Sequence, residues 1–389
     1  MASEDSPVVR AFAVPNSIHW CICYCSTYNE EMFINVMSCL MTAESHESRK
    51  GKVQTVLGLI DPSQLGSTLM HEHLLIDLVP PRLAEDADHD EVEVDLCNCW
   101  KITYGQQPSL KNYRLDQIDV AIEEVEEMIG VGGRSIVDLT TGGLKPNPEG
   151  LATIARSTGA HIVMGCGHYV HEFHFPSNSV KTVEDFASEM VGQLTEGAWG
   201  TSIRAGIIGE IGCQAPWTDQ EKCVVRGALI AQQETGAALN IHPGRDPDQP
   251  QELVDAIRQL GYSTERVIIS HVDRTIFDDD RLFKLADSGC VIEFDLFGWE
   301  QSAYPMSDID MPNDAGRLRM VRALLDRGYG EQVLISHDIC TRTRLGRYGG
   351  HGYQHIFANI VPRMLRRAFT HAEVDQILVE NPARLLTFV

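Results

Sequence analysis

Residues 68–78 read TLMHEHLLIDL, an apolar run that carries two histidines, His71 and His73, one residue apart. A β-strand points alternate side chains to the same face, so a strand here would direct both imidazoles one way and Glu72 the other. Imidazoles that are buried need hydrogen-bonding or metal partners. The stretch therefore predicts a buried strand ending at a polar site, and the partners of its histidines should come from elsewhere in the chain.

Strands of the same type recur through the rest of the chain. Short apolar, β-branched runs that end in glycine or polar residues occupy 66–77, 134–143, 160–169, 205–212, 237–244, 266–273, 290–298 and 332–338. Stretches with apolar residues at helical spacing, such as 115–132 and 219–236, lie between them. Strands alternating with helices predict a parallel sheet, and eight such units predict a (β/α)8 TIM barrel. A doubly wound open sheet is the alternative, but HEHLLIDLVPP is not the glycine-rich phosphate turn of that fold.

Composition and charge limit the partners of the chain. Its 389 residues are 43% hydrophobic, which is enough for a large core. The net charge of −23 disfavours nucleic acid and anionic membranes, although arginines at a site could still bind a small anionic substrate. We find no apolar run long enough to span a bilayer. The 11 cysteines, odd in number and scattered, indicate reduced thiols and a cytoplasmic location.

Two segments depart from the barrel pattern. Residues 1–50 contain C-x-C-x-C at 21–25, which lacks the paired spacing of zinc modules, so we interpret them as a poorly defined N-terminal extension. Residues 51–389 would then form the catalytic barrel. The segment 79–111 is too long for an ordinary connection after the first strand. It is either a lid or substrate wall at the barrel mouth or a solvated insert.

Side chains able to bind a metal follow five of the predicted strands. They are His71, His73, Glu210, His242, His271 and Asp338. In a TIM barrel the functional residues lie at the carboxyl ends of the strands, so these side chains should converge. Imidazole and carboxylate groups bind zinc and similar ions, and six ligands exceed one tetrahedral ion. We therefore predict two divalent metal ions, with zinc as the expected metal, about 3.5–4 Å apart and bridged by a carboxylate and a hydroxide.

Each of these residues taken alone has an ordinary structural role. A buried histidine is more often a hydrogen-bonded core residue than a ligand, and Asp338 could cap the helix that follows. The metal prediction depends on the joint occurrence of the candidates at one face of one fold. A barrel that binds metal or ligand without turnover is an alternative of another class, and it is disfavoured because no ligand position is missing.

The combined motifs resemble the phosphotriesterase family of the amidohydrolase superfamily, and most closely its phosphotriesterase-related branch in animals. Within 51–389 the matching motifs are GKVQTVLGLI, MHEH, GIIGEIGC, IHPGR, SHVDRTI, DLFG, DIDMPND, YGGHGY and ENPARLL. The resemblance implies a TIM barrel of the metal-dependent hydrolase type. It also implies that His71, His73 and Asp338 hold the more buried ion, and that His242 and His271 hold the more exposed one.

One departure from the bacterial phosphotriesterases concerns the bridge between the metals. Those enzymes use a carboxylated lysine on the fourth strand, whereas RAGIIGEIG contains no lysine and places Glu210 there. The resemblance then implies that Glu210 bridges both ions with its own carboxylate. Organophosphate hydrolysis does not follow from the family name alone.

The resemblance also implies catalytic roles for two residues. Asp338 would take the proton of a metal-activated hydroxide and pass it to the leaving group. Tyr169 matches an aromatic position that approaches the substrate oxygen in related lactonases, with ordinary packing as the alternative.

Arginines that follow the ligand strands suggest the substrate. Arg245 and Arg274, with Arg342 and Arg344 further on, could bind carboxylate, sulfonate or phosphate oxygens, unless they pair with nearby Asp or Glu. We expect an amidohydrolase acting on a small anionic amide, namely N-acetyltaurine or a related N-acyl amino acid, as the resemblance implies. A lactone or a phosphotriester is the alternative substrate, and a homodimer is the candidate oligomeric state.

Overall fold

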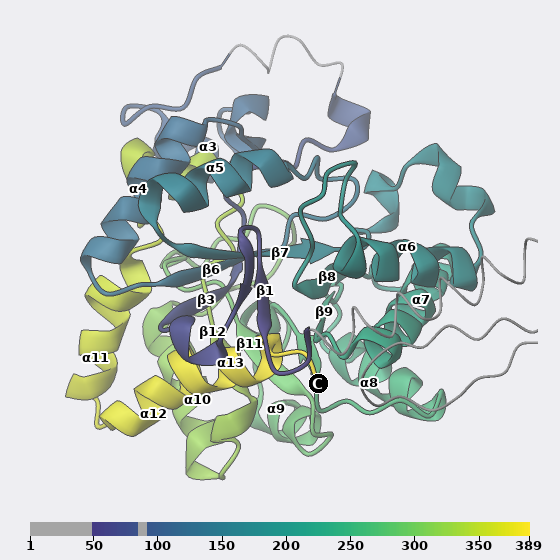
Figure 1. Ribbon diagram of the computed structural model, residues 1–389. Helices are drawn as coiled ribbons and strands as arrows, with labels where there is room; N and C mark the ends of the chain where they lie inside the picture. Colours follow the sequence, from purple (N-terminus) through teal and green to yellow (C-terminus); the bar gives the residue numbers. More distant parts are fainter. Residues whose placement is uncertain (1–48, 85–91) are drawn as a thin grey trace, which may run out of the picture. The chain divides into compact units, whose positions relative to one another are not determined.

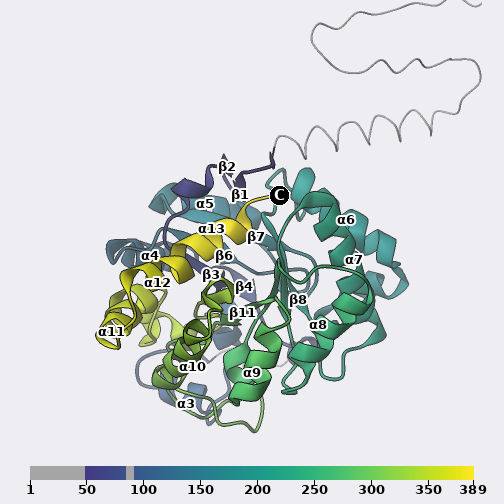
Figure 2. The ribbon, with the colours of Figure 1, turned by 90° about the horizontal axis from the view of Figure 1, so that it is seen from below.

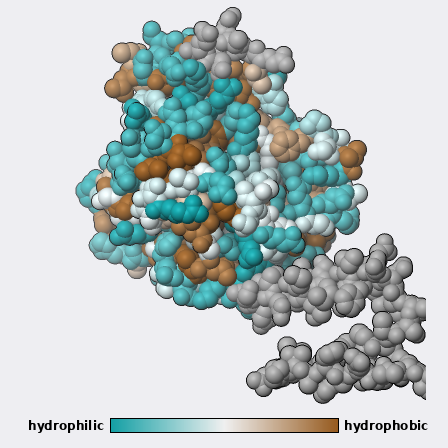
Figure 3. Space-filling model, turned by 45° about the horizontal axis from the view of Figure 1, so that its top comes forward, coloured by the Kyte–Doolittle hydropathy of each residue, from teal (hydrophilic) through white to brown (hydrophobic). Residues whose placement is uncertain are grey.

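The computed structural model describes residues 49–84 and 92–389. The expected N-terminal extension, except for its last two residues, lies outside the described residues, and so do the cysteines at 21–25. Within the described ranges every cysteine is free. No helix in those ranges is long and apolar enough to cross a membrane. On the face shown in Figure 3, hydrophobic residues form separate patches within a largely hydrophilic surface.

Eight parallel strands form the central sheet, in the order β12-β11-β10-β9-β8-β7-β6-β3 (Figure 1). They are β3 (Thr68–Glu72), β6 (Ser135–Asp138), β7 (His161–Cys166), β8 (Ile207–Gly212), β9 (Leu239–His242), β10 (Val267–Ile269), β11 (Val291–Phe294) and β12 (Val333–Ile335). The N–H of His71 donates to Ser336 Oγ at 3.0 Å, which links the first strand to the end of the last. The sheet thus nearly closes on itself, and the predicted TIM barrel is confirmed.

Helices between the strands cover the outside of the sheet (Figure 1). They are α4 (Ile118–Gly130), α5 (Pro148–Thr158), α6 (Val183–Thr195), α7 (Asp219–Thr235), α8 (Gln249–Gln259), α9 (Asp279–Ala286) and α10 (Asp314–Asp326), followed by α11 (Val361–Arg366), α12 (His371–Asp375) and α13 (Asn381–Leu386). Local signals explain their ends. Helix α7 begins at a capping box in which Thr218 and Glu221 satisfy each other's backbone N–H groups. It ends at Gly236, whose φ of 71° is left-handed.

The two ends of the barrel differ. The hairpin β1 (Val53–Thr55) and β2 (Gly58–Ile60) lies with α13 at one end, and α3 (Cys99–Thr103) lies at the other (Figure 2). Buried apolar residues of seven of the eight strands pack with Val53, Leu385 and Leu386, so the hairpin and α13 close the first end. Polar side chains gather at the carboxyl ends of the strands instead.

The long segment after the first strand forms part of a wall. Strand β4 (Ile76–Asp77) pairs antiparallel with β5 (Arg114–Leu115), which brings the two ends of the segment together. Helix α3 and the loops after β11 and β12 enclose a pocket of about 400 Å³. Of the two interpretations of residues 79–111, the described part fits a wall at the barrel mouth.

Candidate metal centre

The six predicted ligands converge at the carboxyl end of the barrel. His73 Nε2 lies 3.4 Å from Glu210 Oε1 and 3.3 Å from Asp338 Oδ1. His242 Nδ1 lies 2.6 Å from Glu210 Oε2, and His271 Nε2 lies 3.5 Å from the same oxygen. The imidazoles and Glu210 are buried, whereas the Asp338 side chain keeps 16% of its surface exposed. Residues far apart in the sequence therefore present their polar atoms to one small volume.

The arrangement of donor atoms fits a bound cation. His71, His73 and Glu210 form one group whose ligand atoms lie within 4.8 Å of one another, and Glu210, His242 and His271 form a second. His71 Nε2 is buried and has no hydrogen-bond partner among the described residues. Such an atom is costly unless a ligand satisfies it, and a divalent ion would do so. Because Glu210 belongs to both groups, the donor set could hold one ion or two ions that share this carboxylate.

The position of Glu210 depends on glycines in β8. A Cβ atom at Gly209 would lie 2.2 Å from the carbonyl oxygen of Asn240, and one at Gly212 would lie 2.0 Å from the backbone nitrogen of Val170. Only glycine allows the backbone to approach its neighbours this closely, and Gly209 also has a left-handed φ of 113°. The motif GEIG therefore places the carboxylate between adjacent strands.

Outer hydrogen bonds fix the orientation of the ligand imidazoles. His73 Nδ1 lies 2.9 Å from Thr140 Oγ1, and His71 Nδ1 lies 3.2 Å from Ser270 Oγ. With Nδ1 engaged in this way, the Nε2 atoms of both rings face Glu210. Partners of this kind fix the tautomer and the direction of metal-binding histidines.

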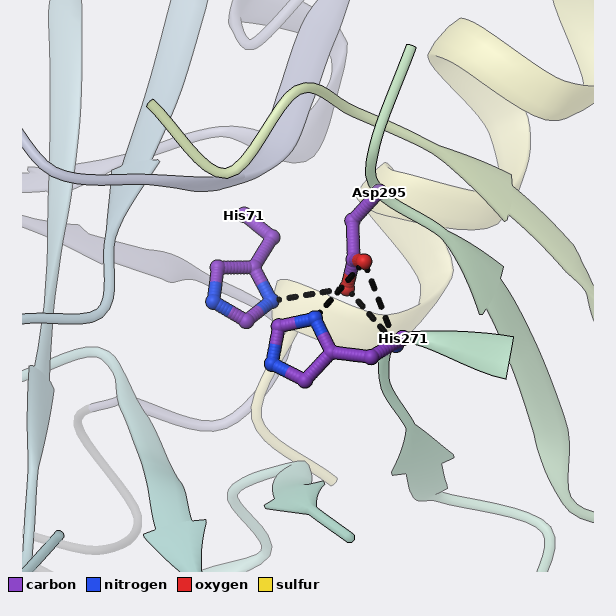
Figure 4. A group of neighbouring side chains, drawn as sticks. All are labelled: His71, His271 and Asp295. Atoms are coloured by element: carbon purple, nitrogen blue, oxygen red, sulfur yellow. Dashed lines mark hydrogen bonds and ion pairs between the residues drawn. The ribbon is translucent and has the colours of Figure 1, made fainter. Parts of the chain in front are cut away.

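Asp295, just after β11, is a buried residue of the centre that the sequence analysis did not name. Its carboxylate lies 2.8 Å from His271 Nδ1 and 3.1 Å from His71 Nδ1, so one side chain holds two candidate ligands (Figure 4). The three residues also form a group that could hold a metal ion. The segment VIEFDLFG carries the signal that identified the other candidates, a polar residue after an apolar strand.

Glu72 points away from the centre, as the alternation of β3 predicts. It accepts hydrogen bonds from Ser336 Oγ at 2.8 Å and from the N–H of Ile339 at 3.0 Å, and it lies 2.7 Å from His337 Nδ1. These contacts hold the backbone on both sides of Asp338, whose φ of 51° is left-handed. His271 is also left-handed, with a φ of 54°. Strained backbone at non-glycine residues is typical of functional sites.

The charges of the centre shift the pKa values of its groups when no metal is bound. Burial alone would raise the pKa of Glu210, but the imidazoles of His242, His271 and His71 outweigh it and hold this pKa well below its usual range. Burial opposes protonation of His73, yet its hydrogen bonds to Asp338 and Glu210 raise its pKa to about 9. Burial lowers the pKa of His242 to about 3, against the influence of Glu210. Without a metal, Glu210 is therefore ionised and His73 is protonated at neutral pH, so a bound cation would replace that proton.

Residues predicted to contact substrate line a cavity of about 30 Å³ beside the candidate ligands. Tyr169, Arg245 and Arg274 all belong to its wall. The Tyr169 ring lies 4.9 Å from the His242 ring. The Arg245 guanidinium lies 3.3 Å from Tyr304 Oη, and its buried Nε has no hydrogen-bond partner in the described part of the chain.

The arginines near the mouth differ in their partners. Arg274 Nη2 donates to the carbonyl oxygen of Pro243 at 3.1 Å. Neither Arg274 nor Arg245 forms an ion pair with a carboxylate of the described residues. Arg342 pairs with Asp116 at 2.9 Å and lines no part of the cavity beside the ligands. Arg344 donates to the carbonyl oxygen of Asp338 at 2.7 Å. Arg245 and Arg274 thus line the cavity without a carboxylate partner among the described residues, although Arg274 Nη2 also lies 3.2 Å from His242 Nε2.

Comparison with known proteins places these features in context. Residues 51–386 match the phosphotriesterase family. N-acetyltaurine hydrolase of Bos taurus is 42% identical over 347 residues, which cover 88% of this chain and 99% of that protein. A phosphotriesterase-related protein of Nematostella vectensis is 40% identical over 87% of this chain and 99% of its own. The crystal structure of a resiniferatoxin-binding protein from Rhodobacter sphaeroides has a TM-score of 0.81 at 33% identity and covers 86% of this chain and 95% of that one.

Proposed function

Because the chain belongs to the phosphotriesterase family, we propose that it is a metal-dependent amidohydrolase that cleaves N-acetyltaurine or a related small N-acyl amino acid. The relative from Bos taurus, which matches over nearly its whole length, carries the name of that activity. One observation carries the proposal: Glu210 belongs to two groups of candidate metal ligands, and these groups lie beside a cavity that two arginines line. That combination suits an anionic amide next to metal ions.

The proposed ligands divide into two sets. His71, His73 and Asp338 would hold one divalent ion, His242 and His271 a second, and Glu210 both. We propose zinc for both ions, since imidazole and carboxylate donors suit it. When bound, such ions lower the pKa of water toward about 7 and polarise a carbonyl group.

The side chains of the chain would perform the remaining steps. Asp338, the most exposed of the proposed ligands, would accept the proton of the attacking water and deliver it to the departing amine. Arg245 and Arg274 would bind the sulfonate or carboxylate of the substrate, and this would fix the amide carbonyl beside the ligands. Tyr169 would contact the carbonyl oxygen from the side of His242.

The size of the cavity implies a movement on binding. About 30 Å³ holds roughly one water molecule, which is too little for the proposed substrate. Tyr304 and Met306, from the loop after β11, form part of the wall. Met306 is 39% exposed, whereas Tyr304 is buried with Trp299 and Met311, so an outward shift of the Met306 side chain would open the cavity at the smaller cost in buried area.

An assay of the purified chain loaded with zinc tests the proposal. N-acetyltaurine, a lactone and an aryl phosphotriester would be compared by kcat/KM. We expect the highest value for N-acetyltaurine. A higher value for the lactone or the phosphotriester would overturn the amide assignment while retaining hydrolysis, and no turnover of any of the three would overturn hydrolysis itself.

A further inference from the structure

A polar layer lies inside the barrel, next to the candidate metal centre. It consists of three fully buried side chains from the adjacent strands β9, β10 and β11, namely Asn240, Ser270 and Glu293. The positions two residues earlier carry apolar side chains of the barrel core, Ala238, Ile268 and Val291. The interior of such barrels is usually filled with apolar side chains, because a buried polar group costs free energy unless it is hydrogen-bonded. A layer of this kind therefore calls for a functional explanation.

Hydrogen bonds join the three side chains to one another. Asn240 Nδ2 donates to Glu293 Oε2 at 2.9 Å. Ser270 Oγ lies 2.8 Å from Asn240 Oδ1 and 3.1 Å from Glu293 Oε2. Because Glu293 presents an acceptor oxygen to Asn240, the amide turns its NH2 group toward Glu293 and its oxygen toward Ser270. The Ser270 hydroxyl thus has two acceptors within the layer for its single proton.

The same hydroxyl connects the layer to His71. Ser270 Oγ lies 3.2 Å from His71 Nδ1. A hydroxyl that donates its proton to the layer can only accept from His71, so the ring proton resides on Nδ1 and the lone pair on Nε2. Nε2 is the buried atom of His71 that has no hydrogen-bond partner among the described residues, and it lies 3.7 Å from Glu210 Oε2. The layer therefore favours the form of His71 whose Nε2 can bind a metal ion.

Glu293 is the member of the layer that is most costly to bury. Its Oε1 has no hydrogen-bond partner in the described part of the chain, and its Oε2 lies 3.6 Å from His71 Nδ1. An apolar side chain at this position would pack with Val291 and Leu334 of the core cluster, without the cost of an unpartnered oxygen. No step of the proposed hydrolysis uses Glu293. Its contact with Asn240 and Ser270 is what distinguishes it from an apolar residue.

We propose that Glu293 is a positioning residue of the metal centre: acting through Asn240 and Ser270, it keeps the proton of His71 on Nδ1 and leaves Nε2 free to bind a divalent ion. This inference rests on the metal centre of the proposed function. Glu293 contacts neither substrate nor ion in this role and adds no chemical step. What the role requires is an acceptor oxygen that faces Asn240.

The zinc affinity of the full chain, measured by competition with a chelator, tests the inference. Glu293→Met removes both oxygens and retains a side chain of similar size, so the Asn240 amide loses its acceptor and can turn. We expect zinc affinity to fall by about 10–100-fold. Glu293→Gln retains a carbonyl oxygen that can accept from Asn240, and we expect its affinity to stay within about threefold of the wild-type value.

Two results would overturn the inference. A loss in Glu293→Gln as large as in Glu293→Met would assign the effect to the charge of the carboxylate rather than to its acceptor oxygen. Wild-type affinity in a folded Glu293→Met chain would remove Glu293 from the metal centre altogether.

A second pair of variants tests the connection through Ser270. Ser270→Ala removes the hydroxyl and should itself lower zinc affinity. Because Glu293 acts through this hydroxyl, adding Glu293→Met to Ser270→Ala should cause no further loss. Losses that add in the double variant would show that the two residues act independently, which contradicts the inference.

Glu124 on α4 provides the matched control. It is also a buried glutamate, but it accepts from the N–H groups of Gly346 and Arg347, outside the barrel interior. Glu124→Met should leave zinc affinity unchanged, even where it lowers the melting temperature. Thermal unfolding shows whether each variant folds, and Glu293→Leu replaces Glu293→Met if the latter does not. A wild-type chain that binds no zinc would overturn the proposed metal centre and this inference with it, whereas zinc binding that is equal in wild type and variants would overturn this inference alone.

Discussion

The backbone N–H of Asp338 donates a hydrogen bond to the carbonyl oxygen of His71 at 3.0 Å. This bond joins the loop after the last barrel strand to the first strand, and both residues are candidate ligands. Glu72, the neighbour of His71, also accepts from the N–H groups of His337 and Ile339 at 2.9 and 3.0 Å. The hydrogen bonds that join the first and last strands of the barrel therefore also bring the candidate ligands His71 and Asp338 together.

Asp295 should govern metal affinity without contacting substrate. In Asp295→Asn, the amide can accept a hydrogen bond from His71 or His271 with its oxygen, but its NH2 group faces the other ring. We expect metal affinity to fall by about 10–100-fold, as measured by competition with a chelator. The exposed Asp280→Asn on α9 is the matched control. Equal affinity in the two variants would remove Asp295 from this role.

Asp338 should be needed for turnover more than for metal retention. Asp338→Asn keeps one oxygen near His73 but cannot accept a proton at neutral pH, so kcat should fall by about 10²–10⁴-fold. Metal content, measured by elemental analysis of the purified variant, should remain largely unchanged. Wild-type turnover in this variant would show that another group moves the proton.

Arg245 should distinguish anionic from neutral amides. Its guanidinium lies at the cavity without a carboxylate partner among the described residues, so Arg245→Gln removes a charge-assisted contact to the substrate. A loss of roughly 1.5–3 kcal/mol corresponds to a rise of about 10–150-fold in KM for N-acetyltaurine. A neutral amide of similar length serves as the comparison. A parallel loss on both substrates would indicate a structural role instead.

The loop after β7, which carries Tyr169, should lose stability in acid. Glu189 lies 3.2 Å from His168 Nε2 and 2.6 Å from Lys181 Nζ. Partial burial alone would raise the pKa of Glu189, but these two partners lower it to about 2. Because the pKa of Glu189 is lower in the folded chain than in the unfolded chain, its ionised carboxylate stabilises the folded state above about pH 4.5. This stabilisation is lost as the pH falls toward 2.

The variant Glu189→Gln tests this pH dependence. It should lower the free energy of unfolding by about 1–2 kcal/mol at pH 7, with partial exposure taken into account, and by less at pH 3. Chemical denaturation at both pH values measures the difference, and Glu184→Gln on the exposed side of α6 is the control. A constant difference between pH 7 and pH 3 would rule out the ion pair as its cause.

The parts of the fold that can be predicted from the sequence are those that carry local signals. Each barrel strand is a short apolar run, and the candidate ligands follow such runs directly, so their shared face could be inferred. The expectation that a functional side chain follows each apolar strand would also have identified Asp295 after β11. Glu293 and Asp295 alternate there in an otherwise apolar stretch.

Other features depend on contacts between distant segments. The register of β3 against β6 shifts between Leu69 and Glu72, an irregularity that depends on how the two strands pair. The left-handed backbone of His271 is held by the Asp295 carboxylate, which accepts from its N–H at 3.0 Å. Arg342 was a candidate for substrate binding until its pairing with Asp116, 226 residues away in the sequence, became visible. No local pattern carries such information.

The central claim is that Glu210 joins two metal ions that the proposed hydrolysis requires. Zinc would be titrated into the metal-free wild-type chain and into Glu210→Ala, with metal per chain and N-acetyltaurine hydrolysis measured on the same samples. We expect the wild-type chain to bind two ions and to regain activity as they bind. We expect the Glu210→Ala chain to bind fewer than two ions and to show no activity. A Glu210→Ala chain that still binds two ions, or a metal-free wild-type chain that hydrolyses at the full rate, would contradict the account.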